Sequence, residues 1–121
     1  MRLFRQPDAH SCGAAAMLMV LRHYGIQEKF NILCEKLNVY GILFNGVTPF
    51  KMLQVLKEYG FYTKLLINSD KCSNVNLVLL SSPLHWVVWY HNGRTWKEYD
   101  PDRAQISDLS SNRFVSAIAL Q

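Results

Sequence analysis

The hydrophobic pattern of the chain changes at Gly60, and this change constrains the fold more than any other feature. Before Gly60, apolar residues recur every three or four positions, which is typical of amphipathic helices. After Gly60, short apolar or alternating runs are separated by polar turns, which is typical of β-strands. Helices followed by strands predict an α+β fold, with the helices packed on a C-terminal antiparallel sheet. The length of 121 residues fits one domain, residues 1–121.

Three helices are expected in the first half of the chain. The first spans residues 12–24 and ends at Gly25, a residue suited to a left-handed cap. The second spans about residues 28–37. The third spans about residues 48–59, where Thr48 is a typical N-cap.

The second half of the chain predicts strands, and the runs that fit them are residues 61–67, 84–90, 95–99 and 114–120. The Asn92-Gly93 pair between two of these runs is the strongest hairpin signal in the sequence. Residues 77–80 are an apolar run that fits a strand or a helix equally well. Residues 100–108 are expected to form a connecting segment.

The first predicted helix begins at a cysteine. Ser11 is suited to cap this helix, which leaves Cys12 at its first position. A thiol reacts as the thiolate, and the unpaired N–H groups and positive dipole end of a helix favour that anion. Gly13 follows directly and allows a substrate backbone to come close, and Gln6 lies six residues upstream. The pattern indicates a nucleophilic cysteine.

A histidine and an aspartate suit the other roles in such a site. His85 stands near the start of the run 84–90, and Asp100 follows the run 95–99. Both fall at the same end of the predicted hairpin, because its centre is about equally far from each. Alternation places His85 on one face of its strand and Trp86 on the other. Cysteine, histidine, aspartate and an upstream glutamine form a complete set for acyl chemistry on a thiol.

Each of these residues also has an ordinary structural interpretation. A cysteine at a helix start is most often a small buried hydrophobe, and a histidine in an apolar strand is most often a core residue. An Asp-Pro pair commonly begins a turn. The catalytic hypothesis therefore depends on the order and the joint geometry of the residues.

The same residues carry a resemblance to a known family. The chain resembles the papain-like cysteine peptidases that trim double-glycine leader peptides from bacteriocins, usually as the N-terminal domain of an ABC exporter. In that family a Gln stands six residues before the Cys, a Gly follows it, and an Ala- and Met-rich helix ends in Tyr-Gly. A His then opens a valine-rich strand, and an Asp-Pro closes the following one. All of these features recur here in order, so the resemblance covers essentially the whole chain.

The resemblance implies a papain-like fold with Cys12 as the nucleophile and His85 as the base. It also implies Asp100 as the orienting group and Gln6 as the oxyanion-hole donor.

Two further positions, Gly13 and Trp86, are expected to border the substrate cleft. The chain departs from the family at Ser11, where an acidic residue often precedes the cysteine. It also departs in lacking a following transmembrane or ATPase segment, so we expect a freestanding domain.

The leading hypothesis is a cysteine peptidase that forms an acyl-thioester intermediate and cleaves after small residues such as Gly-Gly. No cofactor is expected. One alternative keeps the triad but uses it as a glutamine or asparagine deamidase, as a transglutaminase, or in a toxin or effector domain acting on a host or competitor protein. A non-catalytic substrate-binding domain of an exporter is a third possibility, and the retention of Cys12 argues against it.

Composition and charge limit the partners. The net charge of +4 comes from scattered basic residues, and no nucleic-acid-binding module is recognisable. No apolar run is long enough to span a bilayer, and the N-terminus lacks the apolar core of a secretory signal. The expected partners are a peptide or protein substrate and an exporter, secretion-system or immunity protein.

The cysteines indicate a reducing compartment. Three cysteines without regular spacing form neither a disulfide framework nor a metal motif, so no metal is expected. Cys34 lies on the apolar stripe of the second helix and is expected to be buried, whereas Cys72 lies in a polar loop and is expected to be exposed. A cytoplasmic protein is therefore predicted, delivered into a target cell if it is an effector.

Overall fold

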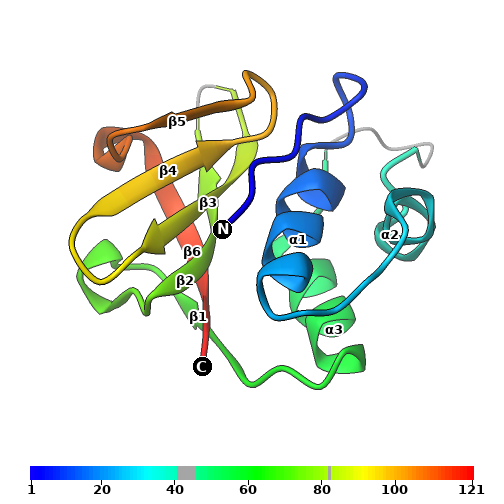
Figure 1. Cartoon of the computed structure of the whole chain (residues 1–121), viewed down its shortest axis with the longest axis horizontal. Helices are drawn as coiled ribbons and strands as arrows, with labels where there is room; N and C mark the ends of the chain where they lie inside the picture. Colours follow the sequence, from blue (N-terminus) through cyan, green and yellow to red (C-terminus); the bar gives the residue numbers. More distant parts are fainter. Residues whose placement is uncertain (41–45, 82) are drawn as a thin grey trace.

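Within residues 1–40, 46–81 and 83–121, which the structure describes, the computed structural model contains three α-helices and a six-stranded sheet (Figure 1). The helices are α1 (Cys12–His23), α2 (Phe30–Leu37) and α3 (Pro49–Glu58). The strands are β1 (Thr63–Leu66), β2 (Val75–Leu80), β3 (His85–His91), β4 (Trp96–Asp100), β5 (Gln105–Ser107) and β6 (Phe114–Leu120). The predicted α+β class is confirmed.

The sheet is antiparallel throughout, with the strand order β1-β6-β2-β3-β4-β5. The C-terminal strand β6 therefore lies inside the sheet, between β1 and β2. β3 and β4 form the hairpin that the Asn92-Gly93 pair predicted, and the pairing of Val88 with Tyr99 fixes its register.

The three helices lie on one side of the sheet, as Figure 1 shows with the sheet at the left and the helices at the right. The central helix is α1, in which every residue from 13 to 21 is buried. A helix that is apolar all round must be covered on all sides, and here β3 covers one side while α2 covers another. Trp86 and Val88 of β3 belong to the core cluster that includes α1.

The opposite face of the sheet has its own apolar cluster, which includes Val87 and Trp89 of β3. Neighbouring residues of β3 thus point to different faces, as the pleat of a strand requires. The strand is buried on both faces over residues 86–89. This makes β3 a rigid support for the side chain of its first residue, His85.

Local sequence signals explain the ends of the helices. The Thr48 hydroxyl accepts a hydrogen bond from the backbone N–H of Lys51 and so caps α3. Gly25 follows α1 with a φ of +81°, and Gly60 follows α3 with a φ of +86°. Both conformations favour glycine and end the helix where the sequence predicted.

Some predicted boundaries differ from the structure. The ambiguous run 77–80 belongs to strand β2, whose two neighbours in the sheet decide its conformation. The segment 100–108 is more than a connection, because it contains β5, which pairs with β4. The second helix begins at Phe30, and the first strand is shorter than residues 61–67. Strand β5 has two exposed residues among its three, and so it lacks the apolar signal by which a strand is recognised.

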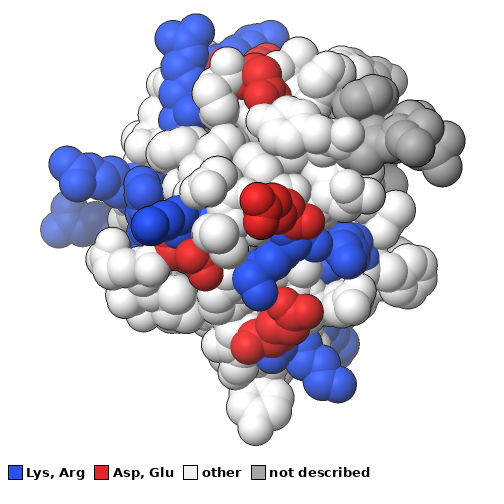
Figure 2. All heavy atoms as spheres, turned by 90° about the vertical axis from the view of Figure 1, so that its right-hand side faces the viewer, with Lys and Arg blue, Asp and Glu red and all other residues white. Residues whose placement is uncertain are grey.

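Acidic and basic side chains lie close together over the helical side of the molecule (Figure 2). One pair joins two helices, because Lys36 Nζ of α2 lies 3.2 Å from Glu58 Oε2 of α3. Both side chains are exposed, so this ion pair contributes little to stability. None of the helices in the described part of the chain combines the length and the apolar character needed to cross a bilayer.

Candidate active site

Three of the predicted site residues stand at the ends of secondary-structure elements. Cys12 is the first residue of α1, His85 is the first residue of β3, and Asp100 is the last residue of β4. The β3–β4 hairpin holds His85 and Asp100 at one end of the sheet. The N-terminal segment places α1 beside that end, as Figure 1 shows.

His85 and Asp100 form a direct hydrogen bond. The Nε2 atom of His85 lies 2.6 Å from Oδ1 of Asp100, and both side chains are largely shielded from solvent, with 13% and 15% exposure. A carboxylate can only accept, so Nε2 carries the proton and donates it. The other ring nitrogen, Nδ1, is then available to Cys12, whose side chain is one of the groups that raise the pKa of His85.

The surroundings of His85 favour its protonated form. Burial by itself lowers the pKa of the imidazole, but hydrogen bonds and opposite charges from Asp100 and Cys12 outweigh it. Together they raise the pKa of His85 from 6.5 to about 9. The imidazole is therefore positively charged at neutral pH, next to a cysteine side chain.

Asp100 is held in its ionised form. Burial raises the pKa of the carboxyl group, but the hydrogen bond and the positive charge of His85 lower it by more. The backbone N–H of Asp102 also donates to Oδ1 of Asp100, at 2.9 Å. The result is a lowered pKa and a carboxylate whose Oδ1 atom has two hydrogen-bond partners.

The contact between His85 and Cys12 occurs at the end of the sheet where β3 begins. By alternation His85 shares a face with Val87, which belongs to the cluster on the side away from the helices. Cys12 lies on the helical side, where it packs against the other cluster. The two side chains meet because each is the first residue of its element, so neither strand nor helix stands between them.

Gln6 lies in the segment before α1 and is buried, with 7% exposure. Its backbone N–H donates to the carbonyl oxygen of Pro101, at 2.9 Å, and so ties the segment to the residue after Asp100. Its side-chain Nε2 donates one hydrogen to the carbonyl oxygen of Asp8, at 2.7 Å. An amide nitrogen carries two hydrogens, and within the described residues this is the single bond that Nε2 makes.

Ser11 occupies the N-cap position of α1 but does not cap it with its side chain. The predicted N-cap position of Ser11, with Cys12 first in the helix, is confirmed. The side chain makes no cap hydrogen bond, because its ψ of 19° departs from the extended conformation that aims a cap hydroxyl at the helix. The Ser11 side chain therefore does not pair with the first N–H groups of α1. Unpaired N–H groups at a helix start favour a negative charge nearby, which suits a thiolate at Cys12.

Gly13 and Trp86 are both buried, and they contact the same residue, Val47. A Cβ atom on Gly13 would lie 3.0 Å from Cγ2 of Val47 and 3.4 Å from Cδ1 of Trp86. Trp86 Nε1 donates to the carbonyl oxygen of Val47, at 2.8 Å. Gly13 thus allows a close approach of a core side chain, and Trp86 packs in the interior. No local pattern in the sequence singles out Val47.

All three cysteines are free. Cys34 is buried on α2, as predicted. Cys72 is half-buried rather than exposed, because it packs against the cluster on the far face of the sheet. Burial raises the pKa of both thiols. Among the described residues, no group of three or more His, Cys, Asp or Glu side chains is arranged to hold a metal ion.

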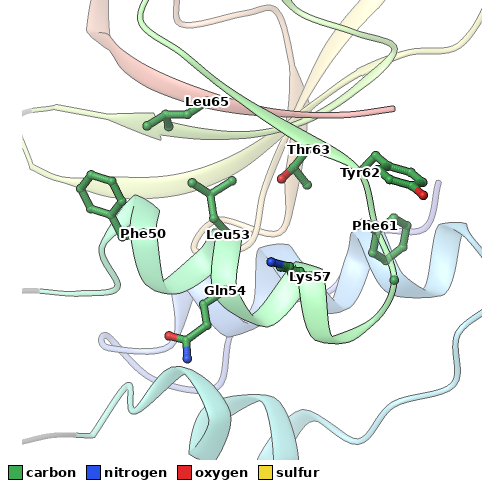
Figure 3. Close-up of a pocket in the computed structure, with 9 residues that line it drawn as sticks. Phe50, Leu53, Gln54, Lys57, Phe61, Tyr62, Thr63 and Leu65 are labelled. Carbon is green, nitrogen blue, oxygen red and sulfur yellow. The ribbon is translucent and has the colours of Figure 1, made fainter.

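A separate groove of about 740 Å³ lies between α3 and β1 (Figure 3). Phe50, Leu53 and Lys57 line it from α3, and Tyr62 and Leu65 line it from the opposite side. None of Cys12, His85 and Asp100 belongs to the described residues that line the groove.

Comparisons with known proteins identify the family of the chain. A family model described as the Peptidase C39 family matches residues 1–116. No curated protein matches the chain.

Solved structures resemble the chain over nearly its whole length. The peptidase domain of Streptococcus ComA, a bi-functional ABC transporter involved in a quorum-sensing pathway, is 23% identical with a TM-score of 0.76, covering 98% of this chain and 96% of that one. A double glycine motif protease from an AMS/PCAT transporter, solved in complex with the leader peptide, is 18% identical with a TM-score of 0.80, covering 98% and 89%. The peptidase domain of Streptococcus mutans ComA is 20% identical with a TM-score of 0.61, covering 100% and 99%. At these identities the likeness establishes the fold.

Proposed function

The chain belongs to the Peptidase C39 family and is a cysteine peptidase, and on that basis we propose that it hydrolyses peptide bonds through Cys12, His85 and Asp100. The observation that carries the proposal is the position of His85. Its imidazole donates to Asp100 on one side and has the Cys12 side chain as a partner on the other. This is the geometric order of nucleophile, base and orienting group.

In the proposed resting state the proton of the Cys12 thiol already lies on Nδ1 of His85, which gives a thiolate beside an imidazolium. The resulting thiolate attacks the carbonyl carbon of the scissile bond and forms a tetrahedral intermediate. His85 then returns a proton to the leaving amine, and an acyl-thioester remains on Cys12. Water, deprotonated by His85, attacks the thioester, and the acid product leaves as the thiol is restored. Asp100 keeps the imidazole in one tautomer and stabilises its positive charge throughout.

The oxyanion of the tetrahedral intermediate needs donors. The backbone N–H of Cys12, at the start of α1, is one candidate, and the second hydrogen of Gln6 Nε2 is the other. Each such donor contributes about 3 kcal/mol to transition-state stabilisation in enzymes where it has been removed.

A peptide with a double-glycine motif is the proposed substrate. The support comes from the similar double glycine motif protease, which was solved with a leader peptide. An ABC exporter is the proposed partner, because similar peptidase domains come from ABC transporters. A nucleophilic thiol stays active only while it is reduced, which favours the cytoplasm as the compartment.

The same triad can also catalyse deamidation or transamidation. The experiment must therefore distinguish cleavage of a peptide bond from modification of a side-chain amide. A pool of synthetic peptides that contain Gly-Gly is incubated with the protein and analysed by mass spectrometry. We expect new termini after Gly-Gly. Mass increases of about one dalton without cleavage would instead indicate deamidation. Cys12→Ala is the control and should abolish either product, while its thermal midpoint stays within a few degrees of the wild type. Full activity in Cys12→Ala would refute the assigned nucleophile.

A further inference from the structure

The segment before α1 contains a chain of hydrogen bonds that the triad itself does not use. It begins at the Gln6 side chain, whose Nε2 donates to the carbonyl oxygen of Asp8, at 2.7 Å. The Oε1 atom of Gln6 is buried and has no hydrogen-bond partner among the described residues. The bond to Asp8 is therefore the contact that sets the direction of the amide group, and with it the direction of the free N–H.

The Asp8 side chain is held from two directions. The Tyr40 hydroxyl donates to Oδ2 of Asp8, at 2.5 Å, and the backbone N–H of His10 donates to Oδ1, at 2.9 Å. Holding the carboxylate restricts movement of the whole Asp8 residue, which also carries the carbonyl that accepts from Gln6. The orientation of Gln6 thus depends on groups that do not contact it.

Tyr40 is well placed to act as an anchor. It stands just after α2, whose C-cap Asn38 adopts the left-handed conformation with a φ of +53°. The next residue, Val39, is buried, and its N–H donates to the carbonyl oxygen of Cys34, at 3.1 Å. The backbone that carries Tyr40 is therefore fixed to α2, whereas Asp8 belongs to an irregular segment.

The charges on the two groups are those that the bond requires. The hydrogen bond from Tyr40 lowers the pKa of Asp8, against a smaller opposing effect of burial. The same bond is the main cause that raises the pKa of Tyr40 to about 12. At neutral pH the phenol therefore donates and the carboxylate accepts, which gives a charge-assisted hydrogen bond.

We propose that Tyr40 and Asp8 are positioning residues that aim the Gln6 amide at the oxyanion, an inference that rests on the proposed peptidase function. Tyr40 is 52% exposed, and a hydrogen bond at such a site adds only about 1 kcal/mol to the free energy of unfolding. The catalytic rate depends more strongly on such a bond than stability does, since a displacement of about 1 Å in a catalytic group can lower the rate about 100-fold. The bond matters for the transition state more than for the fold.

A double-mutant cycle tests the proposal on a fluorogenic peptide amide ending in Gly-Gly. We expect Gln6→Ala to lower kcat by about 100-fold and Tyr40→Phe to lower it by about 10-fold, each with KM within about twofold. In the double variant, kcat should equal that of Gln6→Ala, because Tyr40 acts only through Gln6. Tyr62→Phe, at another exposed tyrosine, is the matched control and should leave kcat unchanged.

A second measurement separates this role from a general disturbance of the site. Alkylation of Cys12 by iodoacetamide forms no oxyanion, so Tyr40→Phe should alkylate at the wild-type rate. Asp8→Asn, which keeps an oxygen acceptor for Tyr40, should retain more kcat than Asp8→Ala.

The outcomes distinguish the positioning role of Tyr40 and Asp8 from the proposed peptidase function. An unchanged kcat in Tyr40→Phe, or a loss that adds to that of Gln6→Ala, refutes the positioning role while the peptidase stands. A normal kcat in Gln6→Ala also refutes it, because nothing is left to position. No cleavage by the wild type, or full cleavage by Cys12→Ala, refutes the proposed function itself.

Discussion

His85 and Asp100 lie 2.6 Å apart, Nε2 to Oδ1, although they belong to opposite ends of a hairpin sequence. Each is a terminal residue of its strand. The backbone of His85 pairs with Leu80 of β2, and that of Asp100 pairs with Gln105 of β5. Their positions depend on the backbone ladder more than on their own bond. A substitution of either side chain should therefore change the chemistry of the site without changing the fold.

The first prediction concerns the pH dependence of cleavage. The imidazolium of His85 supplies the proton to the leaving amine, and its pKa of about 9 places the loss of that proton above neutral pH. We expect kcat/KM to fall on the alkaline side with a midpoint near pH 9, because kcat/KM reports the ionisation of the free enzyme. Initial rates between pH 6 and 10.5 measure this limb.

Asp100→Asn gives the matched variant for that profile. It removes the negative charge that favours the imidazolium, so the pKa of His85 falls and the alkaline limb moves to lower pH by about one unit or more. The thermal midpoint at pH 6 is the control for folding. An alkaline limb at the same pH in both proteins would contradict the assigned pair.

The second prediction concerns stability. Folding raises the pKa of His85 from 6.5 to about 9, so its contribution is complete below pH 6.5 and is lost as the pH rises through 9. The pKa of Asp100 is lowered, so its contribution is present above about pH 4 and is lost as the pH falls further. The pair therefore stabilises the protein most between about pH 4 and 6.5.

Urea unfolding measures this contribution. The free-energy difference between the wild type and His85→Gln should be larger at pH 6 than at pH 9.5. The rise of the His85 pKa from 6.5 to about 9 limits that change to at most about 3.5 kcal/mol, at about 1.4 kcal/mol for each pKa unit. A difference that grows with pH would have the wrong sign and would reject the pair.

The third prediction concerns thiol reactivity. At pH 6 the charged imidazole of His85 lies next to the Cys12 side chain, whereas burial raises the pKa of Cys34 and Cys72. We expect iodoacetamide to label Cys12 about 10 times faster than Cys72. Peptide mapping after timed quenching gives the rates.

His85→Gln is the control for that experiment, since it removes the charge and keeps a polar side chain. It should bring the labelling rate of Cys12 down toward that of Cys72. Equal rates of Cys12 and Cys72 in the wild type would speak against a thiolate–imidazolium pair.

The fourth prediction concerns the core contact behind the site. Trp86→Phe removes the hydrogen bond to the Val47 carbonyl and leaves a buried acceptor unpaired, which costs about 1–3 kcal/mol. The thermal midpoint should fall by about 5 °C. Because Val47 also packs against Gly13, kcat should fall as well. Trp96→Phe, at a partly exposed tryptophan on the other face of the sheet, should lower the midpoint less.

Local signals were sufficient for the helices and for the hairpin. Gly25 and Gly60 ended their helices as predicted, because a left-handed residue after a helix is a property of the glycine itself. The β3–β4 hairpin followed from the Asn92-Gly93 pair for the same reason. Where a strand had no such signal, the prediction failed, as for β5, which is recognised in the structure by its pairing with β4.

The sequence by itself determined the order of elements and the ends at which Cys12, His85 and Asp100 stand, because periodicity, capping residues and turns act over a few neighbouring positions. Only the tertiary structure decided that the end of the sheet at which β3 begins lies beside the start of α1. It also decided that Val47 packs against Gly13 and Trp86, and that the Tyr40 hydroxyl donates to Asp8. Those contacts join residues more than thirty positions apart. They depend on how whole layers pack, a property that no short stretch of sequence carries.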